Sequence, residues 1–186
     1  MVSQLETPAR TALQETPSSD NRVLFPAVNG LVQVFTCAHR SFFTSVMAQA
    51  LRLAGQGTRV CIVQFLKGGI NQGPDRPMRL GQNLDWIRCS LPRCIHDQGL
   101  EDVEQEALQS LWQHTQAAVE AGEYDLFVLD ELSLAIHLGL ISEAAVLDLL
   151  ENRPRHIDII LTGPEMPPVI LAIADQITEI RRSHRL

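Results

Sequence analysis

Apolar residues in the chain follow two spacings, which predict two kinds of secondary structure. Short, nearly continuous apolar runs are typical of strands buried on both faces of a parallel sheet, and apolar residues three or four positions apart are typical of helices. The apolar runs predict strands at 31–35, 59–65, 84–87, 124–129, 157–161 and 175–180. Helical spacing predicts helices at 45–53, 101–121, 142–150 and 167–174. Because strands and helices alternate, we expect an α/β fold with a doubly wound, mainly parallel sheet.

Two segments lack this periodicity. Residues 1–28 mix prolines, serines and scattered charges, and we interpret them as a mobile amino-terminal arm, which leaves 29–186 as a single domain. Residues 68–81 are rich in Gly, Pro and Asn and predict a loop, of a length that often serves a site. Since ligands of such sheets bind beyond the carboxyl ends of the strands, the loops after Phe35, Phe65 and Leu129 are the candidate binding loops.

Composition narrows the classes of function. The chain has 186 residues, 45% of them apolar, and a formal net charge of −7, which argues against general nucleic-acid binding. It has no apolar run of the roughly 20 residues needed to cross a membrane and no signal-peptide pattern, so we expect a cytoplasmic protein without membrane contact. Its four cysteines include no C-x-x-C pair and are expected to be reduced and mostly structural.

The loop after the first strand occupies the place of a phosphate-binding loop but lacks the residues of one. In the pattern G-x-x-x-x-G-K-[ST], glycines let backbone N–H groups surround phosphate, lysine adds charge and the hydroxyl binds magnesium. Here Thr36 and Ser41 stand at the glycine positions, Phe42 at the lysine and Phe43 at the hydroxyl. No other register restores the pattern, because Lys67 is the only lysine in the chain.

Other residues of this loop leave alternatives open. Arg40 is a candidate anion contact, and Thr44 or Ser45 can cap the following helix or offer a hydroxyl at its amino terminus. Phe42 and Phe43 either pack against the domain itself or form an apolar contact with a protein partner. The sequence alone does not choose between these interpretations.

Polar residues at two other strand ends complete the candidate site. Asp130 and Glu131 end an apolar strand as the magnesium-binding acids of a Walker B motif do, although an acidic pair at a strand end is commonly just solvated. Gln64 and Lys67 end the second strand and face the same crevice, unless Lys67 is an ordinary surface charge. The six histidines show no metal-ligand spacing, so we expect no zinc site. Among them only His39, beside Arg40, lies in the altered loop and is of interest for the site.

Several motifs, in order, resemble those of a known family. They are Asn29 to Thr36, Val63-Gln64-Phe65-Leu66-Lys67-Gly68, Leu129 to Ile141, Asn152-Arg153-Pro154 and Leu161-Thr162-Gly163. Over about Asn29 to Arg181 the chain resembles the ATP:corrinoid adenosyltransferases of the BtuR/CobO/CobP type, which act on cob(I)alamin or on cob(I)yrinic acid a,c-diamide. The resemblance implies a P-loop NTPase type of fold, a cytoplasmic homodimer, ATP and Mg²⁺ as cofactors and a corrinoid ligand.

The family's chemistry transfers the adenosyl group of ATP to the reduced cobalt of a corrinoid and releases triphosphate. By position, Asp130 and Glu131 match the magnesium-side acids of the family, and Gln64 and Lys67 match its second-strand motif. Thr36, Arg40, Ser41 and Thr44 then form a degenerate nucleotide site. Phe42 and Phe43 replace the lysine and the first threonine of the family's loop, and Pro164 replaces an arginine.

Two hypotheses follow from these departures. In the first, which we favour, the triphosphate loop is lost and the chain is a non-catalytic or weakly active binding or regulatory homologue, with a corrinoid, a nucleotide or an unidentified protein as its partner. In the second, the chain is an active adenosyltransferase of cobalamin biosynthesis or salvage. The second needs compensation, because losing one charged contact to developing charge costs about 2 to 4 kcal/mol of transition-state stabilisation.

Overall fold

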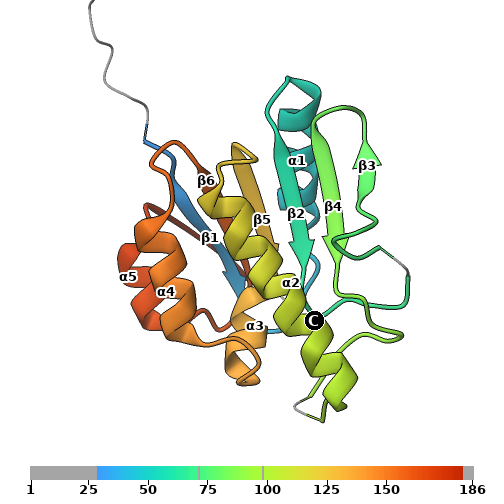
Figure 1. The fold of residues 1–186 in the computed structure, drawn as a ribbon. Helices are drawn as coiled ribbons and strands as arrows, with labels where there is room; N and C mark the ends of the chain where they lie inside the picture. Colours follow the sequence, from blue (N-terminus) through green and yellow to red (C-terminus); the bar gives the residue numbers. More distant parts are fainter. Residues whose placement is uncertain (1–28, 71, 98, 182–186) are drawn as a thin grey trace, which may run out of the picture.

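A seven-stranded sheet forms the centre of the molecule (Figure 1), in a computed structural model that describes residues 29–70, 72–97 and 99–181. The strand order is β3-β4-β2-β5-β6-β1-β7, and every neighbouring pair is parallel except β3 with β4. The strands are β1 (Val32–Cys37), β2 (Val60–Gln64), β3 (Met78–Leu80), β4 (Leu84–Arg88), β5 (Leu126–Asp130), β6 (Asp158–Pro164) and β7 (Gln176–Ile180). The predicted doubly wound, mainly parallel sheet is confirmed; the predicted arm of residues 1–28 lies outside the described residues.

Helices cover both faces of this sheet. They are α1 (Thr44–Gly55), α2 (Asp102–Glu120), α3 (Leu132–His137), α4 (Glu143–Asn152) and α5 (Pro168–Ile173). α1 packs on one face, where Val46 and Met47 join a core with Val60 and Ile62 of β2. The intervening β2 residues, Cys61 and Val63, point to the other face, which α2, α3, α4 and α5 cover. A strand buried on both faces therefore explains the continuous apolar run of residues 59–65.

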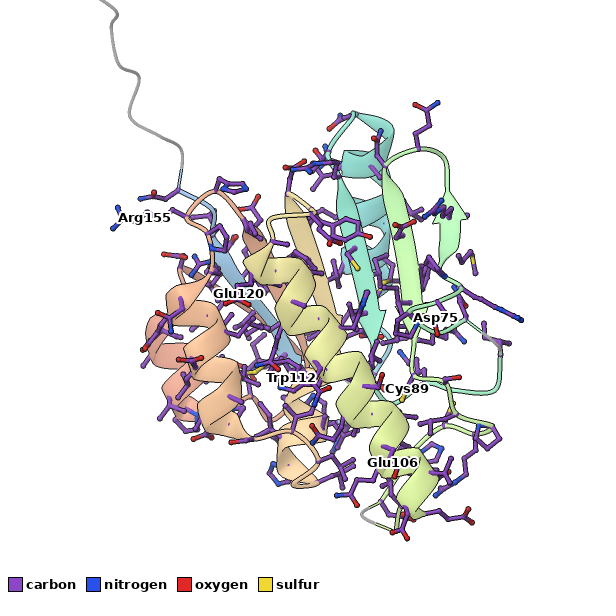
Figure 2. The ribbon with its side chains drawn as sticks, viewed as in Figure 1. Asp75, Cys89, Glu106, Trp112, Glu120 and Arg155 are labelled. Carbon is purple, nitrogen blue, oxygen red and sulfur yellow. The ribbon has the colours of Figure 1, made fainter. Side chains whose placement is uncertain are left out.

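α2 shows how the helical spacing predicts burial. Trp112 and Leu111 are buried against the sheet, whereas Glu106 and Glu120 lie exposed on the same helix (Figure 2). At its start, Glu104 accepts a hydrogen bond from the backbone N–H of Glu101 at 3.1 Å, which satisfies a donor that the helix leaves unpaired. The predicted helix at 101–121 is thus confirmed within a residue at each end.

Two elements were not predicted. β3 lies inside the predicted loop 68–81 and pairs antiparallel with β4 at the edge of the sheet; all three of its residues are exposed, so it has no apolar alternation to detect. α3 directly follows β5 and has six residues, too few to show helical periodicity. Both are short elements whose formation depends on neighbours in space.

The register of the sheet brings the candidate loops together. Gln64 of β2 lies beside Asp130 of β5, and Phe35 of β1 lies beside Thr162 of β6. The parallel strands therefore end at one edge, where the segments after β1, β2, β5 and β6 meet. This edge is where sheets of this type bind ligands.

Candidate functional site

Asp130 and Glu131 are buried at the end of β5. Asp130 is 0% exposed and Glu131 is 2% exposed, so the interpretation as a solvated strand end is wrong. Glu131 has a left-handed backbone with φ of 61°, a conformation that non-glycine residues adopt at a cost. The Glu131 N–H donates to Thr162 Oγ1 at 3.1 Å, and this hydroxyl donates in turn to Asp130 Oδ1 at 2.7 Å. β6 thus holds both acids in place.

Lys67 reaches Asp130 from the loop after β2. Its Nζ donates to Asp130 Oδ2 at 2.7 Å, and Gln64 Nε2 donates to the same oxygen at 2.7 Å. The Lys67 side chain is 18% exposed, so it is not an ordinary surface charge. The next residue, Gly68, packs so closely against the segment 91–93 that a Cβ there would lie 2.3 Å from the Arg93 carbonyl oxygen.

Arg40 reaches Glu131 from the loop after β1. Its Nε and Nη2 donate to the two carboxylate oxygens at 2.7 and 2.6 Å, a bidentate pair. Its Nη1 lies 2.8 Å from the Ile95 carbonyl oxygen and 2.8 Å from His96 Nδ1. The hydrogen bond with Glu131 raises the pKa of Arg40, so this guanidinium remains charged. The predicted anion contact of Arg40 is made here by a carboxylate of the chain itself.

The two cations at this edge, Arg40 and Lys67, neutralise the two carboxylates, Glu131 and Asp130. All four carboxylate oxygens of Asp130 and Glu131 accept hydrogen bonds from side chains of the domain, those of Arg40, Gln64, Lys67 and Thr162. Mg²⁺ requires oxygen ligands in near-octahedral geometry, and three of these four oxygens accept hydrogen bonds from Arg40 or Lys67, while Asp130 Oδ1 accepts from the Thr162 hydroxyl. Within residues 29–70, 72–97 and 99–181, no three His, Cys, Asp or Glu side chains are grouped so as to hold a metal ion. The arrangement does not fit magnesium unless Arg40 or Lys67 first withdraws.

The two phenylalanines of the altered loop have different environments. Phe43 is 2% exposed and belongs to the core beneath α1, so it packs against the domain itself. Phe42 is 50% exposed, and Lys67 Nζ lies 4.8 Å from the centre of its ring. Only Phe42 is therefore available to a partner. The helix begins at Thr44 without a side-chain cap, so the capping considered for Thr44 or Ser45 does not form.

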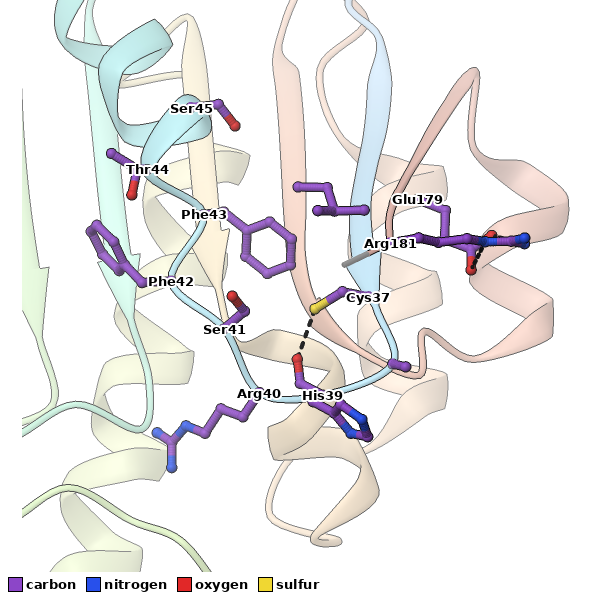
Figure 3. Close-up of a pocket in the computed structure, with 12 residues that line it drawn as sticks. Cys37, His39, Arg40, Ser41, Phe42, Phe43, Thr44, Ser45, Glu179 and Arg181 are labelled. Atoms are coloured by element: carbon purple, nitrogen blue, oxygen red, sulfur yellow. Dashed lines mark hydrogen bonds and ion pairs between the residues drawn. The ribbon is translucent and has the colours of Figure 1, made fainter. Parts of the chain in front are cut away.

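A cavity of about 670 Å³ lies on the inner side of this loop (Figure 3). Its walls are residues 37–45, from the end of β1 to the start of α1, and residues 179–181, at the end of β7 and directly after it. Phe43 points to this inner side, whereas Phe42 and Arg40 extend to the other side. The cavity is therefore lined by the Cys37 thiol and by Phe43, which stands at the hydroxyl position of the phosphate-binding pattern. On the rim, Arg181 pairs with Glu179 at 2.8 Å.

A second cavity, of about 320 Å³, lies beside the ion pairs. Its walls are Ala38, His39, Arg40, His96, Leu134, His137, Pro164 and Glu165. Three histidines from separate segments thus border one space. Sequence reasoning singled out only His39, because the other two are far from it along the chain and show no ligand spacing. Their common position follows from the strand order.

The structure divides the candidate residues into two groups. Arg40, Gln64, Lys67, Asp130 and Glu131 form one connected cluster. Ser41 and Thr44 line the larger cavity, and Thr36 lies in β1 beside Gly163. Thr162, which joins the two acids, was missed as a site residue, although the motif Leu161-Thr162-Gly163 marked its position.

Comparisons with known proteins relate the whole domain to one family. The family model for ATP:corrinoid adenosyltransferase BtuR/CobO/CobP matches residues 28–185. The chain is 27% identical over 152 residues to the corrinoid adenosyltransferase of Escherichia coli K12 and 28% identical over 152 residues to that of Salmonella typhimurium LT2. Each match covers 82% of this chain and 76% of the relative. An uncharacterized protein of Nostoc sp. is 28% identical over 143 residues, which are 71% of this chain but only 38% of that longer protein.

Proposed function

The chain belongs to the ATP:corrinoid adenosyltransferase BtuR/CobO/CobP family, and from this premise we propose that it is a corrinoid-binding, non-catalytic or weakly active homologue that has lost the triphosphate site. One observation carries the proposal: Arg40 and Lys67 neutralise the two acids at the magnesium position. A Mg²⁺–triphosphate complex has to break both ion pairs before it gains ligands. The loop before α1 then has Phe42 and Phe43 at the positions where a lysine and a hydroxyl would contact that complex.

β5, β6 and α3 carry the family motifs Leu129 to Ile141 and Leu161-Thr162-Gly163 at the carboxyl edge, and Gly163 packs so closely that a Cβ there would lie 2.1 Å from Ser133 Oγ. This packing holds the smaller cavity between α3 and the end of β6. The part of the domain beside α3 is therefore the surface that we assign to the corrinoid.

Active adenosyl transfer is the second candidate function. Two observations favour it: the relatives from Escherichia coli and Salmonella typhimurium are corrinoid adenosyltransferases, and the cavity inside the loop has room for a ligand of substantial size. In that case Arg40 and Lys67 move from the acids to the triphosphate when the nucleotide binds. The two candidates therefore differ in whether ATP breaks the ion pairs.

Isothermal titration calorimetry separates the two candidates. We expect no heat of binding when ATP with MgCl2 is added to the wild-type protein or to Asp130→Ala, and saturable binding of hydroxocobalamin or cobinamide by absorbance titration. The Escherichia coli enzyme is the positive control for nucleotide binding. Magnesium-dependent ATP binding that Asp130→Ala abolishes would favour the active enzyme, and absence of corrinoid binding would refute the proposed ligand.

We also propose a cytoplasmic homodimer, as the family resemblance implies, with Phe42 as the contact for any protein partner. The described helices are all too short or too polar to cross a lipid bilayer. A contact role for Phe42 is supported by its exposure, since the residue is 50% exposed beside Lys67. Light scattering after gel filtration tests the dimer: a mass of one chain, about 20.7 kDa, would contradict it.

A further inference from the structure

The last strand of the sheet, β7, has an open edge. It pairs with β1 on one side, and within residues 29–70, 72–97 and 99–181 no strand pairs with its other side. An edge strand presents a row of unpaired N–H and C=O groups, which can bind a further strand. We propose that this edge is the dimer surface, where β7 of a second copy of the chain adds antiparallel and joins the two sheets. The inference rests on the proposed homodimer and specifies the surface that forms it.

The region around β7 is apolar and exposed. Four of the five residues of β7 are exposed, and Thr178 is half-buried. Ile177 and Ile180 point to opposite faces of the sheet, because side chains alternate along a strand. Four of the eleven large apolar side chains that are exposed in the described part of the chain lie between residues 169 and 180, on α5 and β7. A joined sheet would cover side chains on both of its faces.

β7 also lacks the features that usually protect an edge strand from pairing. Such strands commonly carry lysine, proline or several charges. The sequence of β7 is Gln-Ile-Thr-Glu-Ile, in which Glu179 is the only charged residue. The strand is therefore suited to pairing with another chain.

The charges around β7 fit a copy of the same strand. A contact about a two-fold axis requires a surface that complements itself. If the axis passes through Thr178, all residues from 175 to 181 have a partner, and Arg181 lies opposite Asp175 of the second copy at both ends. Opposite charges across an antiparallel pair stabilise it, and like charges destabilise it. An axis through Ile177 would set Asp175 opposite Glu179, and an axis through Glu179 would set two glutamates opposite each other.

Disulfide cross-linking tests this register. Thr178→Cys places two thiols on directly opposite residues, whose Cα atoms are about 4.5 to 5.5 Å apart in an antiparallel pair, within the reach of a disulfide. After mild oxidation with copper phenanthroline, we expect a covalent dimer of Thr178→Cys on a non-reducing gel. The wild-type protein controls for its four own cysteines, and Val103→Cys, at an exposed position of α2, controls for random collision. Both controls are expected to run as single chains.

A charge at the axis tests the surface without a cross-link. Thr178→Lys sets two lysines opposite each other, and we expect the Kd of the dimer, measured by sedimentation equilibrium, to rise by about tenfold or more. Thr178→Val is the matched control and is expected to leave the Kd within about threefold of the wild-type value, because valine suits a paired strand. An unchanged circular dichroism spectrum of Thr178→Lys shows that the dimer is not lost through misfolding.

The outcomes separate this surface from the dimer itself. A wild-type dimer that Thr178→Lys leaves intact, or that Thr178→Cys does not cross-link, overturns the role of β7 and leaves the homodimer with another surface. A wild-type mass of one chain at all concentrations refutes the homodimer, and this surface with it. Corrinoid binding is measured separately and depends on neither result.

Discussion

Arg40 and Glu131 are 91 positions apart in the chain and form a bidentate ion pair at the site. The Glu131 side chain is 3% exposed and that of Arg40 is 26% exposed, so removal of the arginine leaves a carboxylate that water cannot reach freely. Removing one partner of a buried ion pair leaves the other charge buried without a counter-charge. The resulting loss of stability is generally larger than the net stabilisation that the intact pair provides. This asymmetry makes the ion pair testable by stability measurements.

Arg40→Ala is predicted to lower the free energy of unfolding by about 3 kcal/mol, the lower end of the usual range for a buried pair, because Arg40 retains some exposure. Guanidinium chloride unfolding measures this change. Arg59→Ala is the control, since Arg59 pairs with Asp125 at 2.6 Å on the surface, where both side chains are well exposed. That variant is expected to lose much less stability than Arg40→Ala, because water and salt screen an exposed ion pair. Equal losses in the two variants would contradict a buried charge cluster.

The four cysteines are predicted to differ in their reactivity towards thiol reagents, because two are buried and two are exposed or partly exposed. Burial raises the pKa of the Cys89 thiol to about 12 and raises the pKa of Cys61 further, so neither forms thiolate near neutral pH. Cys94 is exposed and Cys37 is partly exposed. A thiol reagent at pH 8 is expected to label Cys94 and Cys37 in the folded protein, with Cys61 and Cys89 labelled only after unfolding. Rapid labelling of all four thiols would show that the core is open.

The loop before α1 contributes one of its two phenylalanines to the core. Phe43 lies in the core that α1 forms with β2 and β5, and the helix begins directly after it. Phe43→Ala is predicted to lower the free energy of unfolding by about 3 to 5 kcal/mol, the usual cost of deleting a buried phenyl ring. Phe42→Ala is the matched control: it removes a half-exposed ring beside Lys67 and is expected to cost about 1 kcal/mol or less. Similar losses in both variants would mean that Phe43 is not part of the core.

Long elements could be predicted from the sequence because their own residues carry the signal. β2, β5 and α2 combine apolar spacing with clear ends, so their bounds agree with the structure within one or two residues, whereas β6 extends three residues beyond its predicted end. β3 and α3 could not be predicted, since each is too short for its pattern to rise above chance. α3 forms where Glu131 turns the chain at the end of β5, a conformation with no signature in the sequence.

The order of strands in the sequence predicted which candidate residues lie close together, but not which of them pair. The rule that parallel strands end at one edge placed Gln64, Lys67 and Asp130 in the same crevice, as the structure has them. No local pattern, however, predicts that Arg40 binds Glu131 or that three histidines border one cavity. Such contacts depend on loop conformations, and these are determined by packing between segments distant in the chain.

The stability of the whole domain is predicted not to depend on magnesium. An ion that binds the native state and not the unfolded state raises the melting temperature, and Asp130 and Glu131 are already neutralised by Lys67 and Arg40. Thermal melting of the wild-type protein is therefore expected to be unchanged by MgCl2, with or without ATP. A clear stabilisation that requires both Mg²⁺ and ATP would show that nucleotide displaces the ion pairs.

We propose that this chain keeps the fold of its family but not the triphosphate site, where Arg40 and Lys67 pair with Glu131 and Asp130. The most direct test is the absorbance spectrum of cob(I)alamin incubated with ATP, Mg²⁺ and the protein under strictly reducing, anaerobic conditions. Because one lost charged contact alone removes about two to three orders of magnitude in rate, we predict adenosylcobalamin formation at least about 100-fold slower than with the Escherichia coli enzyme under the same conditions. Formation of adenosylcobalamin at a rate comparable to that of the Escherichia coli enzyme would contradict the account.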